Sequence, residues 1–316
     1  YESDSDPLIA RFEQALREDA PLFFDAGVTG GQPWEPKNYD GKFEGPMRMR
    51  TAIAKSKNMV SIRILQAIGP QYAQDYVTRF GFDAEKHPPY LTMALGAGSV
   101  TLWQMVRGYG VFANGGFKVE PYIIQRIVDD RGNVMAEAQP PLAGDESLRV
   151  LDARNAFLMD SMLQDVTRSG TAARAASLGR KDLAGKTGTT NESRDTWFNG
   201  YSRSVVATVW VGFDQAQPLG EGEEGSRTAV PIWIDFMRDA LAGVPQRGWP
   251  MPEGLVQARV SLETGALASV DDPDGIFETF MLDRMPTGGI LGGNEMAGVG
   301  SSGVGTVDPT TAEPIF

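Results

Sequence analysis

The chain has 316 residues, with 41 acidic against 29 basic side chains, so its formal charge is −12. Hydrophobic residues make up 41% of it, which suffices for a packed core in one large or two modest domains. The acidic balance argues against a nucleic-acid partner, because neutralising phosphates requires clustered Lys and Arg. The lack of cysteine excludes disulfides and thiolate nucleophiles. One histidine, His87, excludes a multi-His metal site within a single chain.

Residues 1–17 carry an acidic start followed by apolar residues at helical spacing, which predicts a short helix. The stretch 18–50 has no period and many turn residues, so we expect a long ordered loop anchored by Trp34 and Tyr39. Helical periodicity predicts further helices over residues 53–68, 70–80, 101–113, 152–167 and 229–242.

β-Branched and aromatic residues predict strands from residue 117 onward. The segments are 117–127, 134–135, 205–211, 256–262 and 266–269. Helices and strands follow one another without a regular alternation, which favours an α/β fold around an antiparallel sheet. No apolar run approaches the roughly 20 residues that span a bilayer. From residue 287 the chain is rich in glycine, and we expect a mobile tail.

Two short motifs carry side chains suited to catalysis. Ser56-Lys57-Asn58 interrupts a helical stretch, and Lys186-Thr187-Gly188-Thr189 precedes a strand-rich region. Each motif alone also has a structural interpretation, as a capped helix junction in the first case and a strand edge with a glycine bulge in the second. Their occurrence together in this order is more informative, because the pair resembles two of the three motifs, with Ser-x-x-Lys, that β-lactamases and penicillin-binding proteins share.

The second motif suits the binding of an extended peptide. A strand that lines a cleft offers its backbone N–H groups, and Gly188 removes a side chain that would block the approach. Lys186 and the hydroxyls of Thr187 and Thr189 supply donors for a substrate carboxylate. The N–H of Thr189 can form half of an oxyanion hole, where one donor contributes roughly 10²–10³ in rate.

The first motif suits proton transfer and substrate positioning. Ser56 can relay a proton, and the Asn58 amide can hold a peptide group of the substrate. For Lys57 we prefer a solvated lysine over an active-site residue. Thr171, with Gly170, has two open interpretations: it supports the wall of the site, or it caps the preceding helix.

The chain resembles the transpeptidase domain of class A (bifunctional) penicillin-binding proteins, specifically the 1A group of Gram-negative bacteria. The resemblance extends over most of residues 19–286. It rests on ten blocks in the family's order, at residues 19–21, 34–40, 50–63, 94–96, 100–102, 112–116, 170–172, 184–191, 194–201 and 209–212. Chance agreement over so many ordered blocks is not credible.

The resemblance implies the penicillin-binding/serine β-lactamase-like transpeptidase fold, an α/β fold with a central antiparallel sheet flanked by helices. It implies a D,D-transpeptidase that crosslinks peptidoglycan stem peptides ending in D-Ala-D-Ala through a serine acyl-enzyme, without cofactor or metal, and that is acylated by β-lactams. Ser56, Asn58 and Lys186 would be catalytic. Thr187, Gly188 and Thr189 would bind substrate.

The resemblance also implies a longer parent protein with a glycosyltransferase domain. We expect that parent to be anchored in the inner membrane with this chain on the periplasmic side, to act in cell shape and antibiotic resistance, and to have partner proteins of cell-wall synthesis. The expected divisions are 1–17 as a segment of uncertain origin, 18–245 as the transpeptidase domain, 246–286 as a hairpin extension and 287–316 as the tail.

One departure from the family concerns its nucleophile, the serine of a Ser-x-x-Lys motif. No serine of this sequence is followed by lysine three residues on. Ser56 is not a substitute, because Lys57 is adjacent to it rather than one helical turn away. We therefore expect either that the segment with the acylated serine, upstream of Asp19, is lacking, or that the residues before Asp19 are not contiguous with the rest.

Two alternatives to the transpeptidase stay open. One is a D-Ala-D-Ala carboxypeptidase or β-lactamase-like hydrolase, in which water accepts the acyl group. The other is a non-catalytic peptidoglycan-binding module that has lost its nucleophile.

Overall fold

The computed structural model describes residues 18–26, 32–141, 144–262 and 265–286. The helix predicted within 1–17 and the predicted mobile tail lie outside these residues. Contacts divide the described chain into a larger unit, up to Val256 with Thr279–Asp283 added, and a smaller unit from Gln257 to Glu278 with the residues from Arg284 onward. All the motifs singled out above lie in the larger unit.

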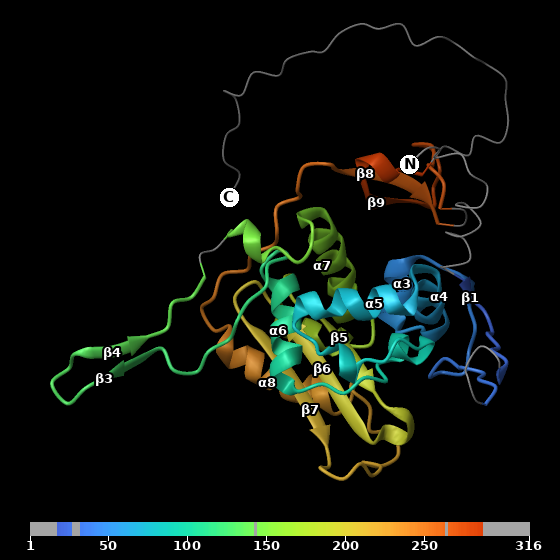
Figure 1. Cartoon of the computed structure of the whole chain (residues 1–316). Coiled ribbons are helices and arrows are strands. Elements are labelled where there is room, and N and C mark those ends of the chain that lie inside the picture. The colour runs from blue at the N-terminus through green and yellow to red at the C-terminus, as the bar shows by residue number, and fades with distance from the viewer. Residues whose placement is uncertain (1–17, 27–31, 142–143, 263–264, 287–316) are drawn as a thin grey trace, which may run out of the picture. The chain divides into compact units, whose positions relative to one another are not determined.

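A three-stranded antiparallel sheet forms the centre of the larger unit (Figure 1). Its strands are β5 (Ala184–Thr189), β6 (Asp195–Tyr201) and β7 (Val206–Gly212), in the order β5-β6-β7. The predicted α/β fold with a central antiparallel sheet is confirmed. Since β6 is the middle strand, β5 is an edge strand of this sheet, and β5 carries the Lys-Thr-Gly motif.

The larger unit has six α-helices within the described residues. They are α3 (Met49–Lys55), α4 (Asn58–Ile68), α5 (Pro70–Val77), α6 (Leu102–Ala113), α7 (Ala153–Arg168) and α8 (Ala229–Ala240). These bounds confirm the predicted helical segments, including the break after residue 55 and the start of a helix at Pro70, where proline at the first position is favoured. Thr101 and Gln104 begin α6 with a capping box.

Helices cover both faces of the sheet because residues at alternate strand positions point to opposite faces. On one face Phe198 of β6 packs against Trp233 of α8, with ring centroids 4.9 Å apart. On the other face Tyr201 joins a buried cluster with Leu163 of α7 and Ala113 of α6. The sheet is therefore clamped between α8 and the pair α6 and α7, which fixes the position of β5.

Two strand predictions need correction. Residues 117–127 form no long strand: β3 is only Arg126–Val128 and pairs with β4 (Val134–Glu137), and every residue of both strands is exposed. β-Branched residues fit a strand only where a neighbour gives them a surface to pack on. The strand partner of β8 (Leu255–Ser261) is β9 (Gly275–Met281), and the predicted partner 266–269 contributes an isolated antiparallel bridge, Val260 to Leu267, rather than a strand.

The predicted long loop before α3 contains two pairings. β1 (Glu18–Asp19) pairs with β2 (Gly45–Pro46), and Phe24 pairs with Trp34. Trp34 stacks on Phe24 at 5.5 Å and packs into a buried cluster, so its predicted anchoring role is confirmed. Tyr39 is not an anchor, because it is 63% exposed.

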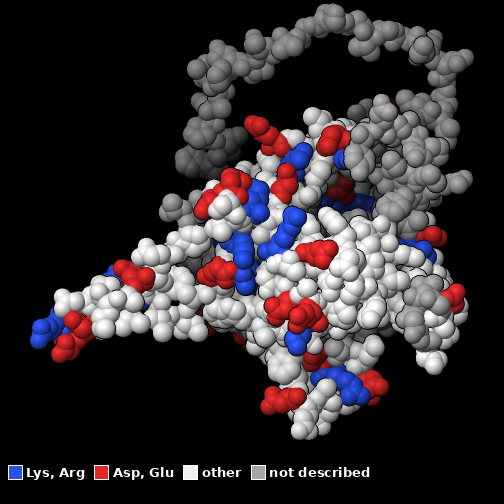
Figure 2. All heavy atoms as spheres, viewed as in Figure 1, with Lys and Arg blue, Asp and Glu red and all other residues white. Residues whose placement is uncertain are grey.

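The remaining described elements are short 3₁₀ helices of three to six residues that connect the others. They are η1 (Thr78–Phe80), η2 (Ala84–Lys86), η3 (Leu91–Leu95), η4 (Glu146–Leu148), η5 (Ala173–Leu178), η6 (Asn191–Ser193) and η7 (Leu282–Arg284). No described helix is long and apolar enough to cross a bilayer. On the face shown in Figure 2, acidic and basic side chains are interspersed.

Candidate active site

Ser56 occupies a sharp turn between two helices. It follows the last residue of α3 and has left-handed backbone angles, φ 57° and ψ 47°, which are uncommon for a residue other than glycine. Its N–H donates to the carbonyl of Ile53 at 3.1 Å, and α4 begins two residues later at Asn58. The turn replaces what would be one continuous helix and leaves the Ser56 hydroxyl at the junction.

Lys186 of β5 meets this turn. Its Nζ donates to Ser56 Oγ at 2.7 Å and to the carbonyl oxygen of Thr187 at 3.0 Å. The two motifs lie 130 residues apart in the sequence and are joined by this contact. The hydroxyl, the ammonium and the edge strand therefore form one site.

Burial lowers the pKa of Lys186 to about 8. A charged ammonium loses hydration energy in this place, and two neutral oxygens return only part of it. The group stays mainly protonated at neutral pH but releases a proton far more readily than an exposed lysine does. Lys186 can therefore both attract an anion and take part in proton transfer.

The open edge of β5 presents two backbone donors. Thr190 N donates to the carbonyl of Asp195 at 3.2 Å, so the amide of Thr190 faces β6. Amide directions alternate along a strand, which turns the N–H groups of Thr187 and Thr189 away from β6. Within the described residues no strand pairs with that edge of β5. An extended peptide can add there as a further strand.

Gly188 lies opposite Trp197 in the β5–β6 register. A Cβ atom at Gly188 would lie 3.2 Å from the Cβ of Trp197, a tight contact. The missing side chain thus has a packing reason in the sheet, besides the access to the strand that the sequence suggested.

The hydroxyls of Thr171 and Thr187 lie 2.6 Å apart. Thr171 also donates its N–H to the carbonyl of Ala54 at 3.0 Å, near the end of α3. Gly170 makes this approach possible, because a Cβ there would lie 2.4 Å from the same carbonyl oxygen. Of the two interpretations of Thr171, these contacts favour the wall of the site.

Thr189 is held by a residue that the sequence did not single out. Gly225 donates its N–H to Thr189 Oγ1 at 3.1 Å. A Cβ at Gly225 would lie 2.6 Å from the carbonyl oxygens of both Gly188 and Trp197. Only its position in a glycine-rich loop before α8 could have drawn attention to it.

The side chain of Asn58 is partly engaged by the preceding loop. Its Nδ2 donates to the carbonyl of Lys37 at 2.7 Å, and its backbone N–H donates to Asn38 Oδ1 at 2.8 Å. The contacts that join Ser56 to Lys186 do not include Asn58. The structure fixes its orientation, and its predicted part in substrate binding stays a prediction.

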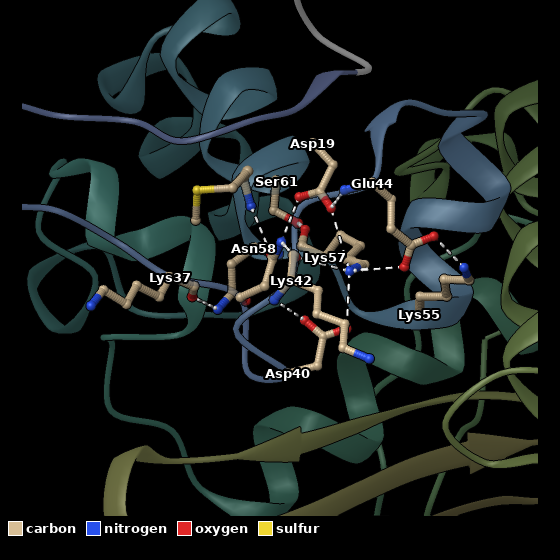
Figure 3. A network of polar contacts seen from close by, with 11 residues as sticks. Asp19, Lys37, Asp40, Lys42, Glu44, Lys55, Lys57, Asn58 and Ser61 are labelled. Carbon is tan, nitrogen blue, oxygen red and sulfur yellow. Dashed lines mark hydrogen bonds and ion pairs between the residues drawn. The ribbon is translucent and has the colours of Figure 1, made fainter.

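Lys57 is buried, so the preferred interpretation as a solvated lysine is wrong. Only 2% of its side chain is exposed. Its Nζ lies 3.0 Å from Asp40 Oδ2, 3.0 Å from Glu44 Oε1 and 3.4 Å from Asp19 Oδ2. Figure 3 draws these contacts as dashed lines. The carboxylates come from the loop before α3, a segment without any periodicity by which sequence alone could place them.

No group of three or more His, Asp or Glu side chains in the described chain is arranged to hold a metal ion. The chemistry available at the junction is that of hydroxyls, an ammonium and backbone N–H groups. These groups suit acyl transfer, in which protons move and an oxyanion must be stabilised.

Comparisons with known proteins identify the family of this chain. Residues 8–238 match the family model of the penicillin binding protein transpeptidase domain. The chain is 47% identical to penicillin-binding protein 1A of Neisseria lactamica over 238 residues, which cover 75% of this chain and 30% of the relative. It is 39% identical to penicillin-binding protein 1A of Pseudomonas aeruginosa over 317 residues, covering 86% of this chain and 38% of the relative.

Among solved structures, penicillin-binding protein 1A from Haemophilus influenzae superposes with a TM-score of 0.79 at 33% identity, covering 87% of this chain and 47% of that one. A penicillin-binding protein from Mycobacterium tuberculosis in complex with penicillin V has a TM-score of 0.62 at 24% identity, over 77% of this chain and 69% of that one, and shows the fold alone. The chain spans about a third of the length of the curated relatives that it matches.

Proposed function

Because this chain belongs to the penicillin-binding protein transpeptidase family, we propose that it is part of a peptidoglycan D,D-transpeptidase that β-lactams inhibit. The observation that carries the proposal is the 2.7 Å contact between Lys186 Nζ and Ser56 Oγ. It unites the second and third motifs of the family beside an edge strand whose amides are free for a peptide.

In the proposed reaction a serine oxygen attacks the carbonyl carbon between the two D-Ala residues. The peptide C–N bond breaks, an ester to the serine forms, and the terminal D-Ala leaves with a proton on its amine. An amine of a neighbouring stem peptide then attacks the ester, and the serine recovers its proton. No cofactor or metal takes part.

We assign the roles as follows. The N–H of Thr189 stabilises the oxyanion, and the strand edge at Thr187 to Thr189 binds the substrate backbone. Lys186 attracts the substrate carboxylate and shares a proton with Ser56, which relays it to the leaving amine. Asn58 holds a peptide group of the substrate.

The nucleophile itself is proposed to lie in a Ser-x-x-Lys motif, which the 316 residues do not contain. Ser56 is held as an acceptor by Lys186 and is adjacent to Lys57, whose ammonium is occupied by carboxylates. We further propose that the whole protein is anchored in the inner membrane, with this chain on the periplasmic side.

The site can be tested by binding, without the nucleophile. We expect a diacetylated Lys-D-Ala-D-Ala peptide to shift the amide NMR signals of Thr187 and Thr189 and the Nζ signal of Lys186 in a saturable way. The control peptide ends in L-Ala-L-Ala and differs only in chirality. Equal shifts with both peptides, or none with either, would contradict the proposed site.

The two alternatives differ in what happens to the acyl group. In protein that includes the Ser-x-x-Lys segment, fluorescent penicillin should label a serine covalently, and dimeric stem peptides should form from monomers. Loss of D-Ala without dimers would support a carboxypeptidase. A folded protein that binds peptide but takes no label would support a binding module.

A further inference from the structure

The buried cation Lys57 raises the question of why a lysine stands inside the Ser-x-Asn motif. We infer that Lys57 is a positioning residue, which ties the Ser56 turn to the preceding loop and so holds the Ser56 hydroxyl against Lys186. The inference rests on the proposed function in one respect. Lys57 positions Ser56 and Lys186, and the proposed function assigns proton transfer to that pair. The Nζ of Lys57 contacts carboxylates and the carbonyl of Lys42, not Ser56 Oγ, among the described residues.

The first support is that the charge of the Lys57 ammonium is balanced on several sides by acceptor groups. Asp40, Glu44 and Asp19 surround it with their carboxylates, and the carbonyl of Lys42 accepts a further hydrogen bond at 3.2 Å. Leaving a buried ammonium without such partners is strongly unfavourable, so these groups and Lys57 must move together.

The charge balance keeps Lys57 protonated. Burial alone would lower its pKa, but the hydrogen bonds to Glu44 and Asp40 and the charge of Asp19 outweigh it and raise the pKa. Lys55 also pairs with Glu44. A cation that stays charged and is 2% exposed is unsuited to exchanging protons with a substrate, which argues against a direct catalytic role.

The second support is the short path from this cluster to the Ser56 backbone. Lys57 directly follows Ser56, and its N–H donates to the carbonyl of Ala52 at 2.9 Å. A left-handed serine is unfavourable on its own and persists only where its surroundings hold it. The buried ammonium fixes the residue on the C-terminal side of that turn.

The third support is a second tie from the same loop. Asn38 Nδ2 donates to Asp19 Oδ1 at 2.6 Å, while Asn38 Oδ1 accepts the N–H of Asn58 at 2.8 Å. In Figure 3 the labelled side chains of Lys57, Asn58 and Asp19 converge on this network. Because Asn38 bonds the first N–H of α4, it caps that helix from outside, where Lys57 offers no side-chain cap. The loop thus holds the helix that leaves the turn.

The experiment replaces Lys57 by Met, which keeps the length and removes the charge. We expect the titration midpoint of Lys186 Nζ, followed by ¹⁵N NMR of the chain, to fall by about one pH unit because the ammonium loses its hydroxyl acceptor. Binding of the D-Ala-D-Ala peptide should weaken about tenfold. Lys57→Arg, which keeps the charge, should restore most of both.

The matched control is Arg180→Met. Arg180 is another largely buried cation, 10% exposed and 2.8 Å from Asp182, and its described contacts, with Asp182, Val244 and Pro245, do not reach Ser56. We expect it to lower the melting temperature as Lys57→Met does while leaving the Lys186 midpoint unchanged. A purely structural role for Lys57 predicts that the two variants behave alike.

An unchanged Lys186 midpoint in folded Lys57→Met would overturn the inference. If that variant does not fold, Asp40→Asn decides, because Asp40 is 48% exposed and its loss is milder. A shift in the same direction supports positioning, and none refutes it. Failure of the wild-type chain to bind the peptide would instead count against the proposed function, since the Lys186 titration does not depend on peptide.

Discussion

At the scale of one residue, the buried charge of Lys186 lowers the stability of the fold that carries the site. Burial lowers its pKa from 10.5 to about 8, so at neutral pH the folded chain holds a charge in an unfavourable place. Between pH 8 and 10.5 the folded state binds fewer protons than the unfolded state, and stability therefore rises with pH in that window.

We predict that Lys186→Met stabilises the chain at pH 7 by about 1 kcal/mol while abolishing peptide binding, because an apolar side chain removes the buried charge. Urea unfolding at pH 7 and pH 10 measures it, and the gain should shrink at the higher pH. A variant less stable than wild type at pH 7 would show that the bonds to Ser56 and Thr187 outweigh the burial of the charge.

At the scale of elements, periodicity located the helices well because each has an apolar stripe with a core to face. Periodicity could not predict the structure of the loop between β1 and α3, because its carboxylates pair with Lys57 only through tertiary contacts. Lys57 looked solvated because lysine usually is. The Ser56 and Lys186 motifs were recognisable from residue type and order. Gly225 acts through its backbone N–H and Asn38 through its side-chain amide, and no local pattern reveals either tertiary contact.

The contact between Gly170 and the end of α3 gives a prediction at this scale. Gly170→Ala places a Cβ against the carbonyl oxygen of Ala54, so α3 must move away from Thr171. We expect a loss of about 1–3 kcal/mol in the free energy of unfolding and weaker peptide binding.

The control is Gly248→Ala, where a Cβ meets nothing within 4 Å. Denaturation and peptide titration of the two variants side by side make the comparison. Equal losses of stability and of peptide binding in the two variants would mean that the close approach of Thr171 to α3 does not position Thr171 in the site.

For the molecule as a whole, a buried carboxyl joins α7 to the sheet. Asp160 accepts hydrogen bonds from Tyr201 Oη at 3.0 Å and from Gln164 Nε2 at 2.7 Å. Burial nonetheless raises the pKa of Asp160. The folded state thus holds this proton more tightly than the unfolded state. The resulting contribution to the free energy of unfolding is complete at low pH and is lost as pH rises through the raised pKa of Asp160.

We predict that Asp160→Asn gains stability relative to wild type as pH rises from about 4 to 7, by about 1 kcal/mol. Asp129→Asn is the control of opposite sign, since hydrogen bonds from Asn133 lower the pKa of Asp129. Urea midpoints from pH 4 to 7 give the difference for Asp160→Asn, and midpoints below about pH 4, where a lowered carboxyl pKa affects stability, give the difference for Asp129→Asn. A flat difference for Asp160→Asn would place its pKa near that of an exposed carboxyl.

The hydroxyl pair of Thr171 and Thr187 has one more consequence. Two hydroxyls bring two hydrogens, and the 2.6 Å contact between them uses only one. Whichever oxygen donates, the other retains a spare hydrogen, and a concerted rotation exchanges the roles. The pair can thus donate a hydrogen bond to an anion or accept one from an amine, without moving any heavy atom. Two hydroxyls that can exchange the donor and acceptor roles would suit an enzyme that must release one amine and bind another at the same place.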